Sequence, residues 1–228
     1  MSIIPDKPPF KILDILYKKE FILFIVLISI LIINSNITPY FLDLYNLIDS
    51  TFLFSEKAII ALTMTFIIIA RHIDLSVASI IAVSSCVLGY TTSLGYDTWM
   101  VLLLTLFSGA LCGAFNGAII TKFAIPSIIV TIGTMSLFRG LAYSFLEDSY
   151  YNKFPKLVSN LGSGYLFGYI PYAFLTFILL AFVFAFILHK TSVGKKIYSI
   201  GNNPDAAQYT GIAVDRYTFV LFTLNGLF

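Results

Sequence analysis

The chain has 228 residues, of which 58% are hydrophobic and 11% are charged, and its formal net charge is +2. Soluble domains carry roughly 25% charged residues, so this composition excludes an ordinary soluble globular protein. A net charge this small gives no reason to expect nucleic acid as a partner.

Apolar residues are grouped in runs close to the ~20 residues that a helix needs to cross a bilayer. Strands of a membrane barrel would instead alternate polar and apolar residues, and the runs show no such alternation. We therefore predict an all-α, polytopic integral membrane protein with a single transmembrane domain over residues 1–228. In chain order, the predicted spans are residues 21–37, 57–71, 73–92, 98–120, 126–146 and 169–188.

The first and last apolar runs differ from an ordinary span. No small-residue cleavage pattern follows Phe21–Ile33, so this run is predicted to be a retained anchor rather than a signal peptide. The last run begins near Tyr217 and stops at Phe228, which is too short to cross a bilayer. The sequence thus predicts six complete spans and a truncated seventh, in a protein that looks incomplete at its C-terminus.

The stretch 57–92 decides the topology, because only Ala58–Ala70 is cleanly apolar in its first half. If the stretch crosses twice and the N-terminus is cytoplasmic, ten Lys and Arg residues fall inside and three outside. If it crosses once, the tally becomes six against six. Cytoplasmic loops of membrane proteins carry an excess of Lys and Arg. We therefore predict two crossings, a cytoplasmic N-terminus and a cytoplasmic loop at 189–216.

Residues 71–76 (Arg-His-Ile-Asp-Leu-Ser) include four polar residues and interrupt two apolar runs. One interpretation is a tight cytoplasmic turn in which Asp74 or Ser76 caps the next helix. The other is a discontinuous helix that reaches into the bilayer, where free backbone groups and polar side chains line a transport route. The shortness of the preceding run favours the second interpretation.

Small residues recur at every fourth position in the fourth predicted span. Gly109, Gly113 and Gly117 lie on one helical face, which allows another helix to approach closely. Packing alone explains this face. Asn116 beside it is polar at membrane depth, so we expect it to bond across helices or to line a cavity.

Arg139 lies within the fifth predicted span, nearer its outer end. An arginine at membrane depth marks a functional site or a specific partner. The alternative is that its side chain extends outward toward Glu147 or Asp148. The sequence does not choose between these interpretations.

The loop 189–216 contains the signals of a short, well-capped helix. Asn203 can cap it, Pro204 suits its first position, and Asp205 meets the positive end of the helix dipole. Gly211 can close its far end in the left-handed conformation. We expect about seven helical residues on the membrane surface, facing a partner.

Enzyme chemistry has little support in the sequence. His72 and His189 lie far apart at predicted membrane edges, and Cys86 and Cys112 lie inside apolar runs. No cluster of metal ligands and no phosphate-binding GxxxxGK loop occurs, so we predict no catalytic site, no metal, no cofactor and no ATP hydrolysis by this chain.

Several motifs occur in the order seen in one family. They are Ile73–Val77, Gly113–Gly117 with Thr121-Lys122, Ile125-Pro126, Val130–Ser136 with Arg139–Ala142, and Gly194–Ile212. On these motifs, which fall between residues 57 and 216, the chain resembles the permease subunits of ribose-type ABC importers. Those importers carry ribose, xylose, galactosides, rhamnose and related small sugars.

The resemblance implies a bacterial cytoplasmic (inner) membrane and a defined set of partners. These are cytoplasmic ABC ATPase subunits, an extracytoplasmic sugar-binding protein, membrane lipid, and a second permease subunit in a homo- or heterodimer. It also implies a coupling helix that transmits ATPase closure, at Gly201, Asn202, Asn203, Pro204, Asp205, Ala206, Ala207 and Gly211. Ala206 and Ala207 are expected to present small side chains to an ATPase groove. A translocation path is implied near Asp74, Ser76, Asn116, Thr131 and Arg139.

The chain departs from the family pattern at two places. Arg71-His72 replaces a pair of glycines, and Ala78 replaces another glycine, so bulk is added where backbones or substrate approach closely. Three other functions remain as alternatives. They are an ion-coupled secondary transporter, a membrane-embedded enzyme, and a permease of the same family that moves a nucleoside or a signalling sugar.

Overall fold

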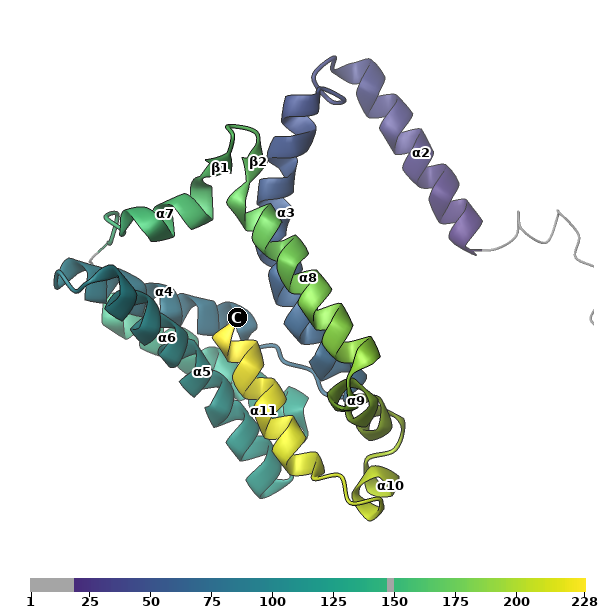
Figure 1. Cartoon of the computed structure of the whole chain (residues 1–228), viewed down its shortest axis with the longest axis vertical. Coiled ribbons are helices and arrows are strands. Elements are labelled where there is room, and N and C mark those ends of the chain that lie inside the picture. The colour runs from purple at the N-terminus through teal and green to yellow at the C-terminus, as the bar shows by residue number, and fades with distance from the viewer. Residues whose placement is uncertain (1–18, 147–149) are drawn as a thin grey trace, which may run out of the picture. The chain divides into compact units, whose positions relative to one another are not determined.

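The structure is a computed structural model that describes residues 19–146 and 150–228 (Figure 1). The chain divides into two compact units, Met1–Ser50 and Thr51–Phe228, and each is considered by itself. The first unit contains α2 (Lys19–Ile37) and the beginning of α3 (Leu44–Ile69). From Phe21 onward, most side chains of α2 are exposed and apolar, as in Leu23 and Ile33, which suits a helix surrounded by lipid.

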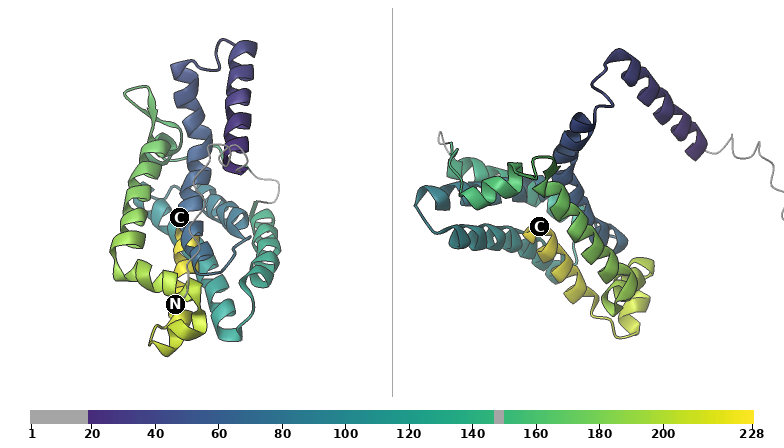
Figure 2. Two further views of the ribbon diagram at one scale, coloured as in Figure 1. Left: turned by 90° about the vertical axis from the view of Figure 1, so that its right-hand side faces the viewer. Right: turned by 45° about the horizontal axis from the view of Figure 1, so that its top comes forward.

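The second unit is built almost entirely of helices. Its elements after α3 are α4 (Val77–Ser93), α5 (Thr98–Phe123), α6 (Ser127–Leu146), α7 (Lys156–Ser163), β1 (Tyr165–Leu166), β2 (Ile170–Pro171), α8 (Tyr172–Lys190), α9 (Ser192–Asn202), α10 (Pro204–Tyr209) and α11 (Val214–Leu227). The two short strands form an antiparallel hairpin. Helices α4, α5 and α6 lie side by side, and α11 packs along α5 (Figures 1 and 2).

Helix α3 is longer than the predicted second span, which was placed at 57–71. It begins at Leu44 and has 26 residues. No Gly or Pro occurs between Pro39 and Gly89, so nothing in the local sequence stops the helix from extending through the polar residues before Ala58. The predicted span was therefore too short, because the length of the apolar run was taken as the length of the helix.

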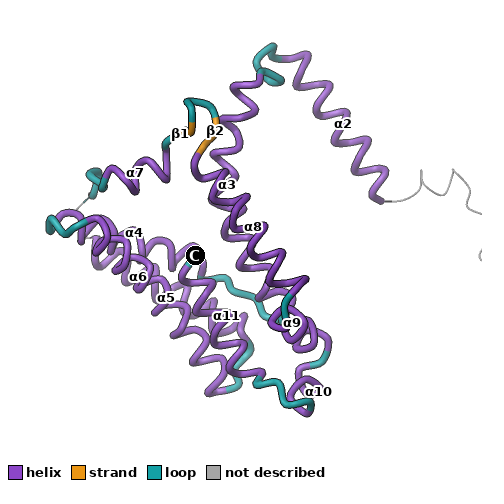
Figure 3. Tube along the Cα trace, viewed as in Figure 1, coloured by secondary structure: helices purple, strands orange, loops and turns teal. Residues whose placement is uncertain are grey.

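Helix α8 runs beside the part of α3 that belongs to the second unit (Figures 1 and 3). Aromatic rings join them edge to face: Phe54 meets Phe174 at a centroid distance of 6.0 Å, and Phe66 meets Phe184 at 5.4 Å. Pairs in this geometry contribute about 0.5–1.5 kcal/mol beyond the area that they bury. The pair α3–α8 is therefore held mainly by ring contacts.

Four helices are long and apolar enough to cross a membrane, among the residues that the structure describes: Leu44–Ile69, Thr98–Phe123, Ser127–Leu146 and Tyr172–Lys190. Two shorter apolar helices are Phe21–Ile37 and Val77–Ser93. Large apolar side chains are exposed on these helices, for example Leu179 and Phe182 on α8, as expected where lipid replaces water. The chain is thus a helical membrane protein.

The main buried cluster lies where α3, α5, α9, α10 and α11 meet. Its largest members with almost no exposed surface are Ile67, Ile197, Ile200 and Phe222. Because residues of the 189–216 loop contribute to this cluster, the loop is part of the packed body of the second unit.

Candidate functional site

The short helix α10 has the predicted caps. The Asn203 side-chain oxygen accepts a hydrogen bond from the Ala206 amide at 3.0 Å, and Pro204 occupies the first turn. Asp205 is also in the first turn, and Gly211 has a φ of +85°, the left-handed conformation that glycine adopts readily. The local prediction is confirmed, with six helical residues instead of about seven.

The two alanines of α10 differ in their exposure. Ala206 is exposed, whereas Ala207 is only 4% exposed and packs in the buried cluster with Ile67 and Ile200. The expectation that Ala207 presents its side chain to a partner is therefore wrong, because a helix this short shows only one face outward and Ala207 lies on the other. The outward face also carries Tyr209, which is 92% exposed.

The loop is fixed to the end of α3 through a glycine. A Cβ atom built at Gly201 would lie far inside contact distance of the Ile69 carbonyl oxygen and 2.9 Å from the Ile69 carbonyl carbon. Real Cβ atoms almost never come within 3.0 Å of such atoms, so only glycine permits this approach. The end of α9 and the end of α3 are thus in direct backbone contact.

Between α3 and α4 the chain leaves the helical conformation, as Figure 3 shows. The turn is confined to Ala70 and Arg71, and residues 72–76 have no regular structure. Both interpretations of this segment, a cytoplasmic turn and a discontinuous helix, stay predictions. Arg71 has a φ of +65°, a left-handed conformation that glycine adopts more readily than other residues. The His72 ring lies 3.2 Å from the Thr218 hydroxyl and meets Phe222 edge to face.

A second set of bonds holds the break against α6. The Ile73 amide donates to the Ser127 hydroxyl oxygen at 3.1 Å, and the Thr131 hydroxyl lies 3.4 Å from the Ile73 carbonyl oxygen. These bonds satisfy backbone groups that no helix partner serves, as buried backbone groups require.

The break leads into a buried polar network centred on Asp74. Its carboxylate accepts bonds from the Ser76 amide (2.8 Å), the Ser76 hydroxyl (2.6 Å) and the Asn225 side-chain amide (2.9 Å). Asn116 donates to the Ser76 hydroxyl oxygen at 2.8 Å, and the Thr63 hydroxyl donates to the Asn225 oxygen at 2.7 Å. The network therefore joins α3, the break, α5 and α11. Ser76 occupies the capping position of α4 but makes no side-chain capping bond; its hydroxyl donates to Asp74 and its oxygen accepts from Asn116.

Four of the residues predicted to lie near a translocation path are buried: Asp74, Ser76, Asn116 and Thr131 are at most 3% exposed. Arg139 is exposed on α6, and its predicted partners Glu147 and Asp148 lie outside the described residues. The role of these five residues in a path remains a prediction.

The glycine face of α5 lies against α11. A Cβ at Gly113 would collide with the Phe222 carbonyl group, and one at Gly109 with the Gly226 carbonyl oxygen. Gly117 approaches Phe219 in the same way, with its built Cβ 3.0 Å from the Phe219 Cα. Gly226, which sequence reasoning did not single out, is the glycine of α11 that makes the approach mutual.

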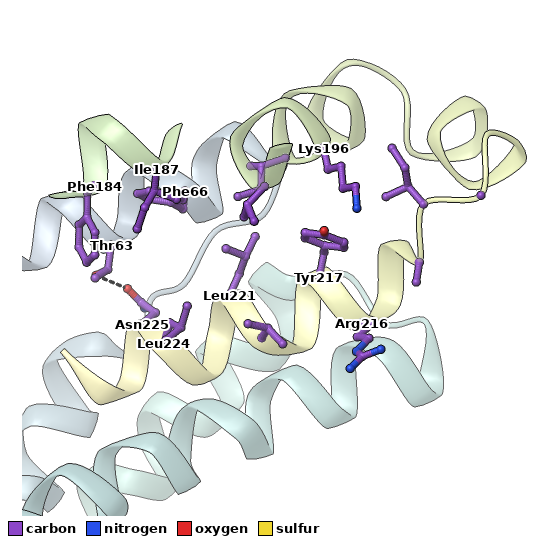
Figure 4. Close-up of a pocket in the computed structure, with 16 residues that line it drawn as sticks. Thr63, Phe66, Phe184, Ile187, Lys196, Arg216, Tyr217, Leu221, Leu224 and Asn225 are labelled. Carbon is purple, nitrogen blue, oxygen red and sulfur yellow. Dashed lines mark hydrogen bonds between the residues drawn. The ribbon is translucent and has the colours of Figure 1, made fainter. Parts of the chain in front are cut away.

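Of the cavities beside α11, two are lined in part by charged residues. The first, of about 490 Å³, is mainly apolar and contains Lys196, whose ammonium group lies 5.7 Å from the centre of the Tyr217 ring (Figure 4). The second, of about 450 Å³, contains polar residues from the break and from α11, including Arg71, His72 and Asp215. No group of three His, Cys, Asp or Glu residues within 19–146 and 150–228 is placed to hold a metal ion.

Comparison with known proteins defines the class. A family model described as "branched-chain amino acid transport system / permease component" matches residues 46–228. The chain belongs to this family of membrane transport permeases.

Two named relatives show which permeases the chain resembles. The chain is 33% identical to the autoinducer 2 import system permease protein LsrC of Escherichia coli O9:H4 (strain HS) over 168 residues, covering 74% of this chain and 49% of that protein. It is 31% identical to the ribose import permease protein RbsC of Haemophilus influenzae (strain ATCC 51907 / DSM 11121 / KW20 / Rd) over 207 residues, covering 89% of this chain and 64% of that protein. The resemblance to ribose-type permeases is confirmed, and the chain spans about half the length of the first of these relatives. No solved structure gives a significant match.

Proposed function

We propose that this chain is the membrane-spanning permease subunit of an ABC importer that moves a small sugar, such as a pentose, a hexose or a related compound. The observation that carries the proposal is α10, a capped helix with an exposed outer face, whose Ala207 is buried in a cluster shared with α3, α9 and α11. Membership of the permease family and the likeness to ribose and autoinducer 2 permeases support it.

In this proposal the chain lies in a bacterial inner membrane with its N-terminus and the loop 189–216 in the cytoplasm. It forms a single permease domain, with six complete crossings and a shorter seventh segment. The charge count from the sequence supports this orientation, because it assigns ten basic residues to the inside and three to the outside, although one of the three, Lys57, lies within α3. A sugar-binding protein docks outside, a second permease subunit completes the pathway, and separate ATPase subunits bind and hydrolyse ATP.

The outer face of α10 is the surface that an ATPase groove would enclose. Ala206 and Asp205 lie on this face, and a small side chain at Ala206 lets the groove close around the helix. Closure of the ATPase subunits would then favour one of two conformations of the membrane part, which is how a separate motor drives alternating access.

The coupling role is tested with Ala206→Glu in the permease assembled with its ATPase subunits and binding protein in proteoliposomes. We expect sugar uptake to fall at least about tenfold, the effect of ~1.4 kcal/mol, because bulk and charge enter the groove. Ala206→Ser keeps the side chain small and serves as the matched control. Unchanged uptake and unchanged ATPase stimulation in Ala206→Glu would refute the proposal.

The comparisons name two classes of cargo, amino acids and sugar-like compounds, and uptake can be tested for both. The family description names branched-chain amino acids, whereas the named relatives import ribose and autoinducer 2. Uptake of radiolabelled ribose and leucine, each with and without ATP, separates these cargoes. Uptake that collapses with an uncoupler at constant ATP would instead favour an ion-coupled carrier.

A further inference from the structure

Two separate arms of the chain connect α10 with the Asp74 network. One arm runs from α10 through α11, which begins at Val214, to Asn225. The other runs from α10 back to α9, crosses at Gly201 to the carbonyl group of Ile69, and continues along the break to Asp74. The arms meet where the Asn225 amide donates to the Asp74 carboxylate at 2.9 Å.

We infer that the Asp74–Asn225 hydrogen bond joins the two arms into a closed ring of contacts. Because the ring is closed, α10, α11 and the break move as one body. The inference rests on the proposed function for its consequence, which is that displacement of α10 by an ATPase reaches the interior of the membrane part through this bond. Asp74 and Asn225 act as positioning residues in this scheme.

The hydrogen-bond partners of Asp74 and Asn225 hold the two side chains in one arrangement. Asp74 receives three donors and has no cationic partner among the described residues, so its carboxylate depends on neutral hydrogen-bond donors alone. Asn225 is 4% exposed and both ends of its amide are used, one by Asp74 and the other by Thr63. A buried polar group that loses its partner destabilises the structure more than the bond itself contributed, so the pair tolerates little separation.

The amide and carboxylate roles can be exchanged between the two positions. Asn225→Asp removes the amide that donates to the Asp74 carboxylate and places a second carboxyl group in its position. In the double variant with Asp74→Asn, the amide introduced at position 74 donates to the carboxylate introduced at position 225, whose other oxygen still accepts from Thr63. Asp74→Asn alone is expected to be mild, because the Asn225 amide can turn over and Thr63 can accept as well as donate.

The test is amide hydrogen exchange on the purified chain in detergent, which does not depend on any transport activity. We expect Asn225→Asp to raise exchange at least about tenfold in both the break and α10, the effect of losing a buried hydrogen bond to a charged group. Adding Asp74→Asn should restore protection at both places. Thr223→Val is the matched control, because that hydroxyl bonds only to the Phe219 carbonyl oxygen of its own helix.

Exchange that rises only within α11, or a double variant no better protected than Asn225→Asp, would overturn the inference. In the assembled importer, ATP hydrolysed per sugar moved should rise for Asn225→Asp and return in the double variant. A merely structural role would lower the amount of assembled importer at an unchanged ratio, and that result would also overturn it. If the unaltered importer shows no ATP-dependent uptake, the proposed function fails while hydrogen exchange still decides whether the ring exists.

Discussion

Replacing Gly113 by alanine should force α5 and α11 apart. The added Cβ would meet three backbone atoms of α11: the Phe222 carbonyl oxygen, the Phe222 carbonyl carbon at 3.0 Å and the Gly226 Cα at 3.1 Å. Ordinary van der Waals contact begins at 3.4 Å, and backbone atoms cannot rotate out of the way as side-chain ends can. The whole helix must therefore shift.

Overpacking of this kind destabilises a protein by about 1–3 kcal/mol. The matched control is Gly133→Ala, because a Cβ at Gly133 on α6 has nothing within 4 Å. Alanine is the better helix former by up to ~1 kcal/mol, so the control should be neutral or stabilising. Thermal unfolding of both purified variants in detergent measures the difference. Equal stability of the two variants would refute the reasoning that the α5 glycines bring α11 close.

Accessibility to a thiol probe should follow the two faces of α10: in inside-out vesicles, cysteines at Ala206 and Tyr209 should react, while a cysteine at Ala207 should not. In intact cells an impermeant probe should label none of them, and labelling at Tyr209 would place the loop outside. Arg71→Gly should stabilise the chain by up to about 1 kcal/mol, because a φ of +65° suits glycine and strains other residues. A lowered unfolding temperature would contradict this expectation.

Local signals predicted α10 well, because its caps act within a few residues. Asn203, Pro204 and Gly211 each specify backbone geometry directly, and the structure follows them. The direction of Ala207 could not be predicted in the same way. Which face of a six-residue helix is buried depends on the cluster that Ala207 joins, and this cluster includes Ile67 of α3, about 140 residues earlier in the chain.

The Asp74 network was foreseen only in part. Asn116 was expected to bond across helices because it is polar at membrane depth, and the same argument applied to Asn225 would have drawn attention to it. The sequence could not pair Asn225 with Asp74, because 151 residues separate them. The end of α3 at Ile69 was also hidden, since no Gly or Pro follows it and tertiary bonds hold the break.

The distance between Asp74 and Asn225 along the chain bears on how the protein is made. Ribosomes add about 5–20 residues per second, so Asp74 is synthesised roughly 8–30 s before Asn225. Of the three donors that this carboxylate has in the folded structure, only the two from Ser76 are present during that interval. Settling of this region into the bilayer is therefore finished late, when α11 leaves the translocation machinery.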